Sequence, residues 1–458
     1  MPHLEFDTDL IKRYDLSGPR YTSYPTAVQF HEDFSVEDYI NQVTLSNQSG
    51  RPLSLYFHLP FCDTICFYCA CNKIVTKNRK RAQPYLDHLH QEIALQAELF
   101  DNSRKVDQLH WGGGTPTFIN HEQMRELMQQ TRKHFNLHDN DQGEYSIEID
   151  PREANRETIT LLRELGFNRL SLGVQDVDPV VQKAVNRIQA AGQTTEVIDS
   201  AREQGFHSVS IDLIYGLPHQ TEERFARTLE AVLAMNPDRL SVFNYAHLPE
   251  MFKTQKQINV EDLPTPGTKL AILENTINTL TNAGYVYIGM DHFAKPDDEL
   301  AKAQAHGNLY RNFQGYSTHA NCDLLGLGVT SIGMINDSYN QNYRDIDQYS
   351  LALADHRLPI MRGIILNDDD KVRRRVITDL ICNFKLNKQS IEQAYNINFD
   401  NYFAQALQQL IPMQRDGLVE LNNDVITVTA KGSLFIRNIC MCFDHYLSQT
   451  QQRFSKVL

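Results

Sequence analysis

The sequence lacks an excess of positive charge, because its 44 Lys and Arg residues stand against 57 Asp and Glu residues, for a net charge of −13. That balance argues against nucleic acid or an anionic membrane surface as the main partner. No apolar run reaches the length of a membrane span, so we expect no membrane insertion. The opening residues lack the basic and apolar regions of a signal peptide, and repeats are missing too. With 458 residues, enough for two or three domains, we expect a globular cytoplasmic protein.

Cysteine is also scarce, but its eight residues are unevenly placed, with four of them between Cys62 and Cys71. The CxxxCxxC spacing of Cys62, Cys66 and Cys69 lets three thiolates converge on one inorganic centre, since soft thiolates select iron-sulfur clusters or zinc. Three cysteines leave one iron of a four-iron cluster without a protein ligand. Such an open position suits an enzyme better than an electron carrier.

Three other interpretations of these cysteines are possible. Cys71 could complete a structural zinc site, although zinc knuckles use CxxC pairs and Cys69 and Cys71 are only two residues apart. A disulfide would need an oxidising compartment, which the absence of a signal peptide disfavours. Buried inert thiols rarely crowd so densely. Buried, unreactive thiols are the better interpretation of the four remaining cysteines, which are isolated along apolar patterns: Cys322, Cys382, Cys440 and Cys442.

From residue 51 to about 295, apolar β-branched runs alternate with helical patterns, which is typical of βα units on a parallel sheet. One helix is predicted to begin near Pro84 and another to end before Gly284. Six units predict an α/β fold with an incomplete (βα)6 barrel. The predicted strands are Leu53 to Leu59, Gln108 to Trp111, Tyr145 to Ile149, Arg169 to Val174, Val209 to Tyr215 and Leu240 to Tyr245.

Polar clusters follow each predicted strand. Active sites of βα barrels collect at the C-terminal ends of the strands, so we expect these clusters to meet at one mouth. Taken singly, the glycine run could be a tight turn, Glu148 could belong to a structural salt bridge, and His292 is more typical of a satisfied polar residue than of a ligand. The clusters are the cysteine loop, Gly112 to Pro116, Glu148 to Arg152, Gly173 to Asp176, Asp212, and Asn244 to His247.

The flanking segments differ from the barrel. Residues 1–50 form a predicted N-terminal arm, whose Ser17 to Thr26 stretch holds two prolines and a glycine and is therefore irregular. Residues 51–355 include the barrel and its closing segment. Residues 356–458 are predicted to form a mostly helical domain that resembles a winged-helix module. Its predicted elements are helices from Arg375 to Phe384 and from Phe403 to Gln414, a short hairpin across Asn422 and Asn423, and a last helix that ends at Tyr446.

The CxxxCxxC loop directly after a barrel strand is similar to the signature of the radical S-adenosylmethionine (SAM) superfamily. Its flanks, from Ser54 to Cys62 and from Cys69 to Lys73, resemble more narrowly the oxygen-independent coproporphyrinogen III oxidases, as does the SGPRYTSYPT string of the arm. The resemblance covers essentially the whole chain. It implies a radical SAM partial barrel with the arm and the winged-helix-like domain.

The resemblance also implies an activity. Two propionate side chains of coproporphyrinogen III would be decarboxylated to vinyl groups, giving protoporphyrinogen IX in porphyrin biosynthesis, with one SAM consumed for each propionate. The alternative is a haem-binding carrier on the same fold, against which Cys71 and the SGPRYTSYPT arm both argue. A radical SAM enzyme for a nucleotide or RNA is disfavoured by the net charge and the flanks.

The cofactors implied are a 4Fe-4S cluster, with Cys62, Cys66 and Cys69 as its ligands, and SAM. The implied partners are coproporphyrinogen III and a one-electron donor such as a flavodoxin or ferredoxin, and the implied oligomeric state is a monomer. Because the substrate carries four carboxylates, Arg20 and Arg311 are candidates to bind it. The family's SAM contacts match Tyr56, Tyr68, Gly113, Gly114, Thr115, Glu148, Gln175, Arg187, Asp212, Ala246 and Ile332.

Overall fold

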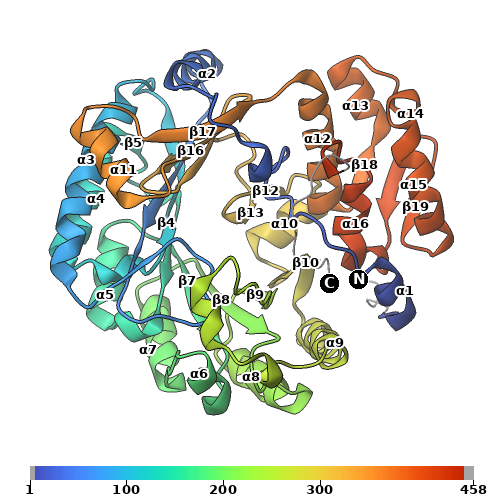
Figure 1. The fold of residues 1–458 in the computed structure, drawn as a ribbon, viewed down its shortest axis with the longest axis horizontal. Coiled ribbons are helices and arrows are strands. Elements are labelled where there is room, and N and C mark those ends of the chain that lie inside the picture. The colour runs from blue at the N-terminus through green and yellow to red at the C-terminus, as the bar shows by residue number, and fades with distance from the viewer. Residues whose placement is uncertain (1–5, 448–458) are drawn as a thin grey trace. The chain divides into compact units, whose positions relative to one another are not determined.

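The computed structural model describes residues 6–447, which divide into two compact units (Figure 1). The barrel unit comprises residues 30–272 and 321–365. The terminal unit comprises residues 1–29, 273–320 and 366–458, and therefore groups both ends of the chain. The sequence-based domain boundaries divide the chain differently and stay a prediction.

Six parallel strands form the centre of the barrel unit, in the spatial order β9-β8-β7-β6-β4-β1. Each strand lies beside the one that precedes or follows it along the chain, as βα units require. The predicted incomplete barrel is therefore confirmed. The strands are β1 (Leu53–Leu59), β4 (Lys105–Gly113), β6 (Glu144–Ile149), β7 (Arg169–Gln175), β8 (Ser208–Tyr215) and β9 (Arg239–Asn244).

The sheet continues beyond β1 with a strand from much later in the sequence. β14 (Asp323–Leu327) pairs parallel to β1, and Gly326 lies opposite Tyr56. Three antiparallel strands follow at this edge, β15 (Ile332–Ile335), β16 (Ser338–Asn342) and β17 (Ile360–Ile365). At another place in the sheet, the short β5 (Asn136–Leu137) pairs with β4.

Helices alternate with the parallel strands and lie on their outer side (Figure 1). Side-chain caps mark where several begin: Asn120 before α4, Asn155 before α5 and Thr221 before α8 each accept a backbone N–H of the first turn. The helices of this part are α2 (Val36–Ser49), α3 (Ala82–Ala97), α4 (His121–His134), α5 (Arg156–Glu164), α6 (Pro179–Ala184), α7 (Ala191–Glu203), α8 (Glu222–Ala234) and α11 (Ile346–Ala354). α9 (Pro266–Asn282) crosses the boundary between the units.

The core of the barrel unit lies between sheet and helices. Six of the seven residues of β1 are buried, as expected for a parallel strand covered on both faces. Trp111, the single tryptophan, is fully buried, and its ring lies 4.8 Å from that of Phe167 and 6.4 Å from that of Phe57. These contacts pack β1 and the segment between α5 and β7 against the middle of the sheet.

The terminal unit is mostly helical, with a three-stranded sheet in the order β18-β20-β19. The turn between β19 (Val419–Leu421) and β20 (Val425–Val428) contains Asn422 and Asn423, as predicted. Its helices are α1 (Thr8–Tyr14), α10 (Glu299–Ala305), α12 (Asp368–Asn383), α13 (Lys388–Tyr395), α14 (Phe399–Tyr402), α15 (Ala404–Arg415) and α16 (Ile436–Met441), and its other strands are β18 (Lys385–Asn387), β10 (Val286–Gly289), β11 (His292–Ala294), β12 (Tyr310–Asn312) and β13 (Gly315–Ser317).

Two helix boundaries here differ from the sequence prediction. α12 begins at Asp368 rather than at Arg375, because Asn367 and Asp370 form a capping box at its start. α16 ends at Met441 rather than at Tyr446. The Ser17 to Thr26 stretch lies outside any α-helix, as its prolines predict.

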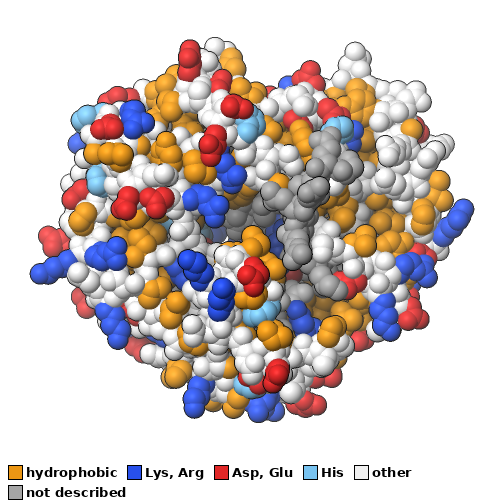
Figure 2. Space-filling view, viewed as in Figure 1, with side chains coloured by type: hydrophobic (Ala, Val, Ile, Leu, Met, Phe, Trp, Pro, Cys, Tyr) orange, Lys and Arg blue, Asp and Glu red, His pale blue; other side chains and the backbone are white. Residues whose placement is uncertain are grey.

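The surface agrees with the acidic composition. Figure 2 shows Asp and Glu side chains interspersed with Lys and Arg side chains on the face in view. Mixed charge of this kind differs from the continuous basic surface that nucleic-acid binding uses. Among residues 6–447, the helices are too short or too polar to cross a bilayer.

Candidate active site

The cysteine loop leaves the end of β1 and is closed at its base by a short parallel pairing of β2 (Phe61–Cys62) with β3 (Ile74–Val75). Backbone hydrogen bonds join the two ends, from Ile74 N–H to the Pro60 carbonyl at 2.7 Å and from Thr76 N–H to the Cys62 carbonyl at 2.9 Å. The loop therefore begins and ends at one place, which draws its cysteines together.

Other parts of the barrel unit hold the middle of this loop. The Phe67 N–H donates to the Val185 carbonyl at 3.0 Å, and the Asn186 amide donates to the Ile65 carbonyl at 2.8 Å. The Gln255 amide donates to the Tyr68 carbonyl at 3.1 Å. These contacts come from beyond β7 and β9, so the finished barrel fixes the shape of the loop.

A cavity of about 250 Å³ opens beside the loop. Its walls contain Cys62, Cys66 and Cys69 together with residues that follow the ends of β4, β6, β7 and β8. The mouth predicted from the strand ends therefore exists in the structure. Eight of the predicted SAM contacts line this cavity, namely Tyr68, Gly113, Gly114, Thr115, Glu148, Gln175, Arg187 and Asp212.

The other three predicted SAM contacts lie outside the cavity lining. Tyr56 on β1 stacks on His110, and the centroids of the two rings lie 5.8 Å apart. Ala246 follows β9, and its carbonyl accepts the Gln255 amide at 3.2 Å. Ile332 begins β15. The two predicted substrate residues, Arg20 and Arg311, both belong to the terminal unit.

The glycine run after β4 is required by close packing. A Cβ on Gly114 would lie 2.7 Å from the Phe61 carbonyl oxygen, and Gly113 has a φ of +114°, which disfavours a side chain. The Gly114 N–H donates to the Leu59 carbonyl at 2.8 Å, which ties this run to the end of β1. A side chain at Gly113 or Gly114 would therefore collide with the His58 ring or with the backbone of Pro60 and Phe61.

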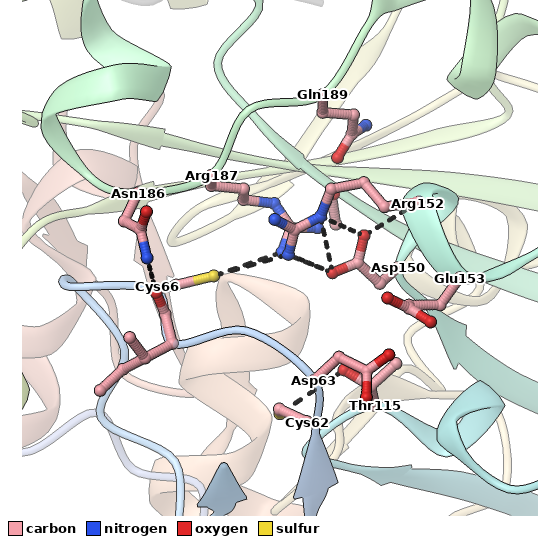
Figure 3. A network of polar contacts seen from close by, with 12 residues as sticks. Cys62, Asp63, Cys66, Thr115, Asp150, Arg152, Glu153, Asn186, Arg187 and Gln189 are labelled. Carbon is pink, nitrogen blue, oxygen red and sulfur yellow. Dashed lines mark hydrogen bonds and ion pairs between the residues drawn. The ribbon is translucent and has the colours of Figure 1, made fainter. Parts of the chain in front are cut away.

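An arginine network surrounds the Cys66 thiol (Figure 3). Arg187 Nη1 lies 3.6 Å and Arg152 Nη2 lies 3.8 Å from Cys66 Sγ. The Asp150 carboxylate joins the two guanidinium groups, at 2.9 Å from Arg187 Nη1 and 2.6 Å from Arg152 Nη2. Burial raises the pKa of Asp150, but the charge of Arg187 and the bonds from Arg152 lower it overall, so the carboxylate stays ionised.

The other thiols are in different surroundings. A hydrogen bond with the Cys71 thiol and the positive charge of Lys73 lower the pKa of Cys69 to about 6, although burial opposes this. Burial raises the pKa of Cys62 to about 11, and Thr115 Oγ1 lies 3.5 Å from its sulfur. Thiolate is the form that binds iron or zinc, and binding a metal ion itself favours deprotonation.

Two carboxylates, on the strands to either side of β7, form another wall. Glu148 accepts the Gly113 N–H at 3.1 Å and lies 3.4 Å from His110 Nε2. Burial raises the pKa of Glu148, but the hydrogen bond and charge of His110 lower it overall. Asp212 differs, because burial and then the charge of Glu148 raise its pKa to about 6. At neutral pH both groups are mainly ionised, which suits a ligand with hydroxyl or amino donors.

Some cavity groups have no hydrogen-bond partner among the described residues. They are Gln175 Oε1 and Arg187 Nε, both buried. Gln175 also has a φ of +68°, a strained conformation that clusters at ligand sites. An unused acceptor and an unused donor in one cavity indicate a polar ligand with complementary groups.

The sequence analysis did not assign several residues that line this cavity. Asp150 and Arg152 are the most informative, since they contact Cys66 or its neighbour Arg187. Their signal was the Asp-Pro-Arg string directly after β6, which placed them at the mouth without revealing their partner. Cys71 and Lys73 also line the cavity and remain outside the predicted ligand set.

The residues present fit the implied cofactors. Three cysteines on one short loop are a suitable donor set for an iron-sulfur cluster, and the guanidinium groups offset the negative charge of thiolate-bound iron. The glycine backbone, the unpartnered Gln175 oxygen and the two carboxylates fit the amino, carboxylate and ribose groups of SAM.

Comparisons with known proteins agree with this site. The radical SAM superfamily matches residues 56–232, and the HemN C-terminal domain matches residues 366–435. An oxygen-independent coproporphyrinogen III oxidase of Pseudomonas aeruginosa is 55% identical over 99% of both chains. The Escherichia coli protein of that name is 52% identical, again over 99% of both chains.

A solved structure leads to the same family. Coproporphyrinogen III oxidase (HemN) from Escherichia coli, described as a radical SAM enzyme, superposes with a TM-score of 0.93 at 52% identity. The match covers 97% of this chain and 100% of that one. With such relatives over its whole length and with the cysteine loop at the mouth of its barrel, the chain belongs to the oxygen-independent coproporphyrinogen III oxidases of the radical SAM superfamily.

Proposed function

We propose that this chain converts coproporphyrinogen III to protoporphyrinogen IX by oxidative decarboxylation of two propionate side chains to vinyl groups. The observation that carries the proposal is the cavity that joins three cysteines of a CxxxCxxC loop to the glycine and carboxylate walls of the barrel. The whole-length relatives supply the substrate. They carry the oxidase name, so the haem-carrier alternative finds no support in them.

The chemistry needs a cofactor, because an unactivated C–H bond resists acid–base catalysis at neutral pH. When bound, the reduced 4Fe-4S cluster and SAM supply a carbon radical able to remove a hydrogen atom from a propionate. Each propionate then loses carbon dioxide and one further electron as its vinyl group forms. Two propionates react, so two SAM molecules are consumed per product.

The roles of the chain's own residues follow from their positions. We propose Cys62, Cys66 and Cys69 as cluster ligands, with Arg152 and Arg187 beside the Cys66 sulfur. Gly113, Gly114 and Thr115 offer backbone to the SAM amino acid portion, and Glu148 and Asp212 accept its donors. Tyr68, Gln175 and Arg187 complete this wall. Tyr56, Ala246 and Ile332 are proposed from the resemblance, since the cavity lining does not include them.

The substrate contacts and the electron donor are also proposals. Arg20 and Arg311 are the candidate groups for the substrate carboxylates, which suit the planar guanidinium fork. A flavodoxin or ferredoxin is the proposed one-electron donor. The cytoplasmic location and the monomeric state also stay predictions.

The test is an anaerobic assay of the iron-reconstituted, reduced protein with SAM and coproporphyrinogen III. We expect 5′-deoxyadenosine and the vinyl product to appear together, and both to vanish in Cys66→Ser because one cluster ligand is lost. Cys442→Ser is the matched control, since Cys442 is a half-buried thiol bonded only to the Asn438 carbonyl and should leave turnover intact.

The outcomes separate the steps of the proposal. Cleavage of SAM without a vinyl product would keep the superfamily and remove the substrate. A protein that binds zinc and shows no iron-sulfur absorption would refute the interpretation of the cysteine loop.

A further inference from the structure

The terminal unit contains a cluster of three arginines from distant parts of the sequence. Arg20 belongs to the N-terminal arm, Arg311 to β12 and Arg437 to α16. Arg311 is 7% exposed and Arg437 is 5% exposed. Burial, followed by the positive charges of Arg20 and Arg311, lowers the pKa of Arg437 to about 10. At neutral pH Arg437 is still a cation, and its charge interacts with those of Arg20 and Arg311.

The three guanidinium groups differ in what they contact. Arg20 Nη1 forms an ion pair with Asp291 Oδ2 at 2.8 Å. Arg437 donates from Nε to the Pro19 carbonyl at 2.9 Å and from Nη2 to the Gly18 carbonyl, so it holds the backbone just before Arg20. Arg311 instead lies over the Tyr316 ring, with its guanidinium carbon 4.7 Å from the ring centroid.

Arg311 is left incompletely satisfied by the described residues. Its Nε and Nη1 atoms are both buried and lack a hydrogen-bond partner among residues 6–447. Contact with an aromatic face offsets part of the cost of burying the charge but engages no N–H donor. Buried donors almost always have partners, so two on one charged side chain indicate a ligand with acceptor oxygens.

The positive charge of the cluster also favours an anionic ligand. Among the charged groups that act on the Arg437 guanidinium, Arg20 and Arg311 are cations, and the carboxylate Asp291 is paired with Arg20. Asp444 lies near the arm as well, where it accepts the Tyr21 hydroxyl at 2.9 Å, and burial raises the pKa of that carboxyl. Uncompensated buried charge is costly, and an anionic ligand would remove the cost.

We infer that Arg311 and Arg437 form a carboxylate-binding site in the terminal unit, and that a propionate of the tetrapyrrole occupies it. Arg311 donates directly to the carboxylate. Arg437 adds positive potential and fixes the Gly18–Pro19 backbone, which positions the arm. Arg20 pairs with Asp291 in this cluster and stays a separate candidate for a substrate carboxylate. The identity of the ligand rests on the proposed function, whereas the carboxylate specificity rests on the cluster itself.

The test uses coproporphyrin III, a stable tetracarboxylate, and its tetramethyl ester, which has the same ring without the charges. Binding to the full-length protein is followed by porphyrin absorbance. We expect Arg311→Gln to raise the Kd for coproporphyrin III at least tenfold, because a charge-assisted bond is lost. The Kd for the ester should not change. Arg375→Gln is the matched control, an exposed arginine of the same unit paired with Asp379.

A second measurement covers the case in which the variant folds poorly. Without ligand, Arg311→Gln should unfold at the same or a higher temperature than the wild type, because an uncompensated buried cation is removed. Coproporphyrin III should raise the unfolding temperature of the wild type more than that of the variant. An unchanged Kd for both porphyrins would overturn the inference and leave water as the partner of Arg311.

Failure of this site is distinguishable from failure of the proposed function. Turnover of coproporphyrinogen III by the wild-type enzyme tests the function alone. If turnover occurs but Arg311→Gln binds coproporphyrin III as the wild type does, only this inference is wrong. If binding depends on Arg311 but no vinyl product forms, the carboxylate site stands and the proposed reaction is wrong.

Discussion

At the scale of single residues, the Arg152–Asp150–Arg187 network determines the surroundings of Cys66. Both guanidinium groups point N–H donors at the sulfur, while Asp150 holds their orientation (Figure 3). Hydrogen bonds and positive charge beside a ligand sulfur stabilise the form of a cluster that carries the additional electron. We therefore propose that these side chains influence the reduction potential of a cluster held by Cys66.

A prediction follows for Arg152→Gln in the reconstituted protein. Loss of this cation should lower the reduction potential, and we expect a roughly tenfold smaller ratio of reduced to oxidised cluster at a fixed potential, which is about 59 mV for one electron. The measurement is a redox titration monitored by electron paramagnetic resonance. Arg163→Gln, which removes an ion pair with Asp141 outside the cavity, should leave the potential unchanged. Equal potentials in all three proteins would remove Arg152 from this role.

At the scale of elements, α3 is joined to the sheet edge by a buried carboxylate. Glu92 accepts the Gly328 N–H at 2.7 Å, the Tyr349 hydroxyl at 2.6 Å and the Asn342 amide at 2.6 Å. One side chain thus connects α3 with the end of β14, with β16 and with α11. The segment after β14 leads to Ile332, a proposed SAM contact.

The same carboxylate makes stability depend on pH. Burial raises the pKa of Glu92 from 4.5 to about 7. A raised folded-state pKa means that the contribution of Glu92 is fully present below pH 4.5 and is lost as the pH rises through 7. When the pH is raised from 5 to 8, we expect the unfolding free energy of Glu92→Gln to increase by up to about 3 kcal/mol relative to that of the wild type.

The measurement is urea unfolding at these two pH values, followed by the fluorescence of Trp111, the single tryptophan, which reports on the barrel unit. Glu98→Gln is the control, because Glu98 is an exposed residue at the end of the same helix. A difference between Glu92→Gln and wild type that is equal at both pH values would contradict the argument.

At the scale of the whole molecule, contacts between distant segments assemble both units. In the barrel unit, the buried Arg104 Nη2 pairs with Asp323 Oδ2 at 2.5 Å, across a sequence separation of 219 residues. Asp323 begins β14, and its other oxygen accepts the Asn336 N–H at 3.0 Å. This ion pair therefore fixes the late strand against the early half of the barrel.

Asp323→Ala should be strongly destabilising, since it leaves the charge of Arg104 buried without its carboxylate partner. We expect a loss of about 3–5 kcal/mol in unfolding free energy. Trp111 fluorescence in urea gives the measurement. Asp355→Asn, which alters an exposed pair with Arg357, should cost almost nothing. A small effect of Asp323→Ala would show that water reaches Arg104 in the variant.

The sequence by itself determined the order of the six parallel strands and the position of the cysteine loop after the first. Both depend on local patterns: apolar runs of strand length, turn residues between them, and cysteines close enough in sequence to converge. Position at a strand end also placed Glu148, Gln175 and Asp212 at one mouth, because parallel strands end at one edge of the sheet. The start of α12 and the end of α16 were less predictable, since capping residues and packing set helix ends.

Only the tertiary structure decided which charges meet. Arg152 and Arg187 reach Cys66 across 86 and 121 residues of sequence, and Arg437 reaches Gly18 across 419. No periodic pattern in the sequence predicts such pairs, because each pair forms only when the whole chain has folded. The same reason applies to Arg311. Its type and neighbourhood made it a candidate for a carboxylate ligand, but its buried and unpartnered N–H groups are a property of the folded unit alone.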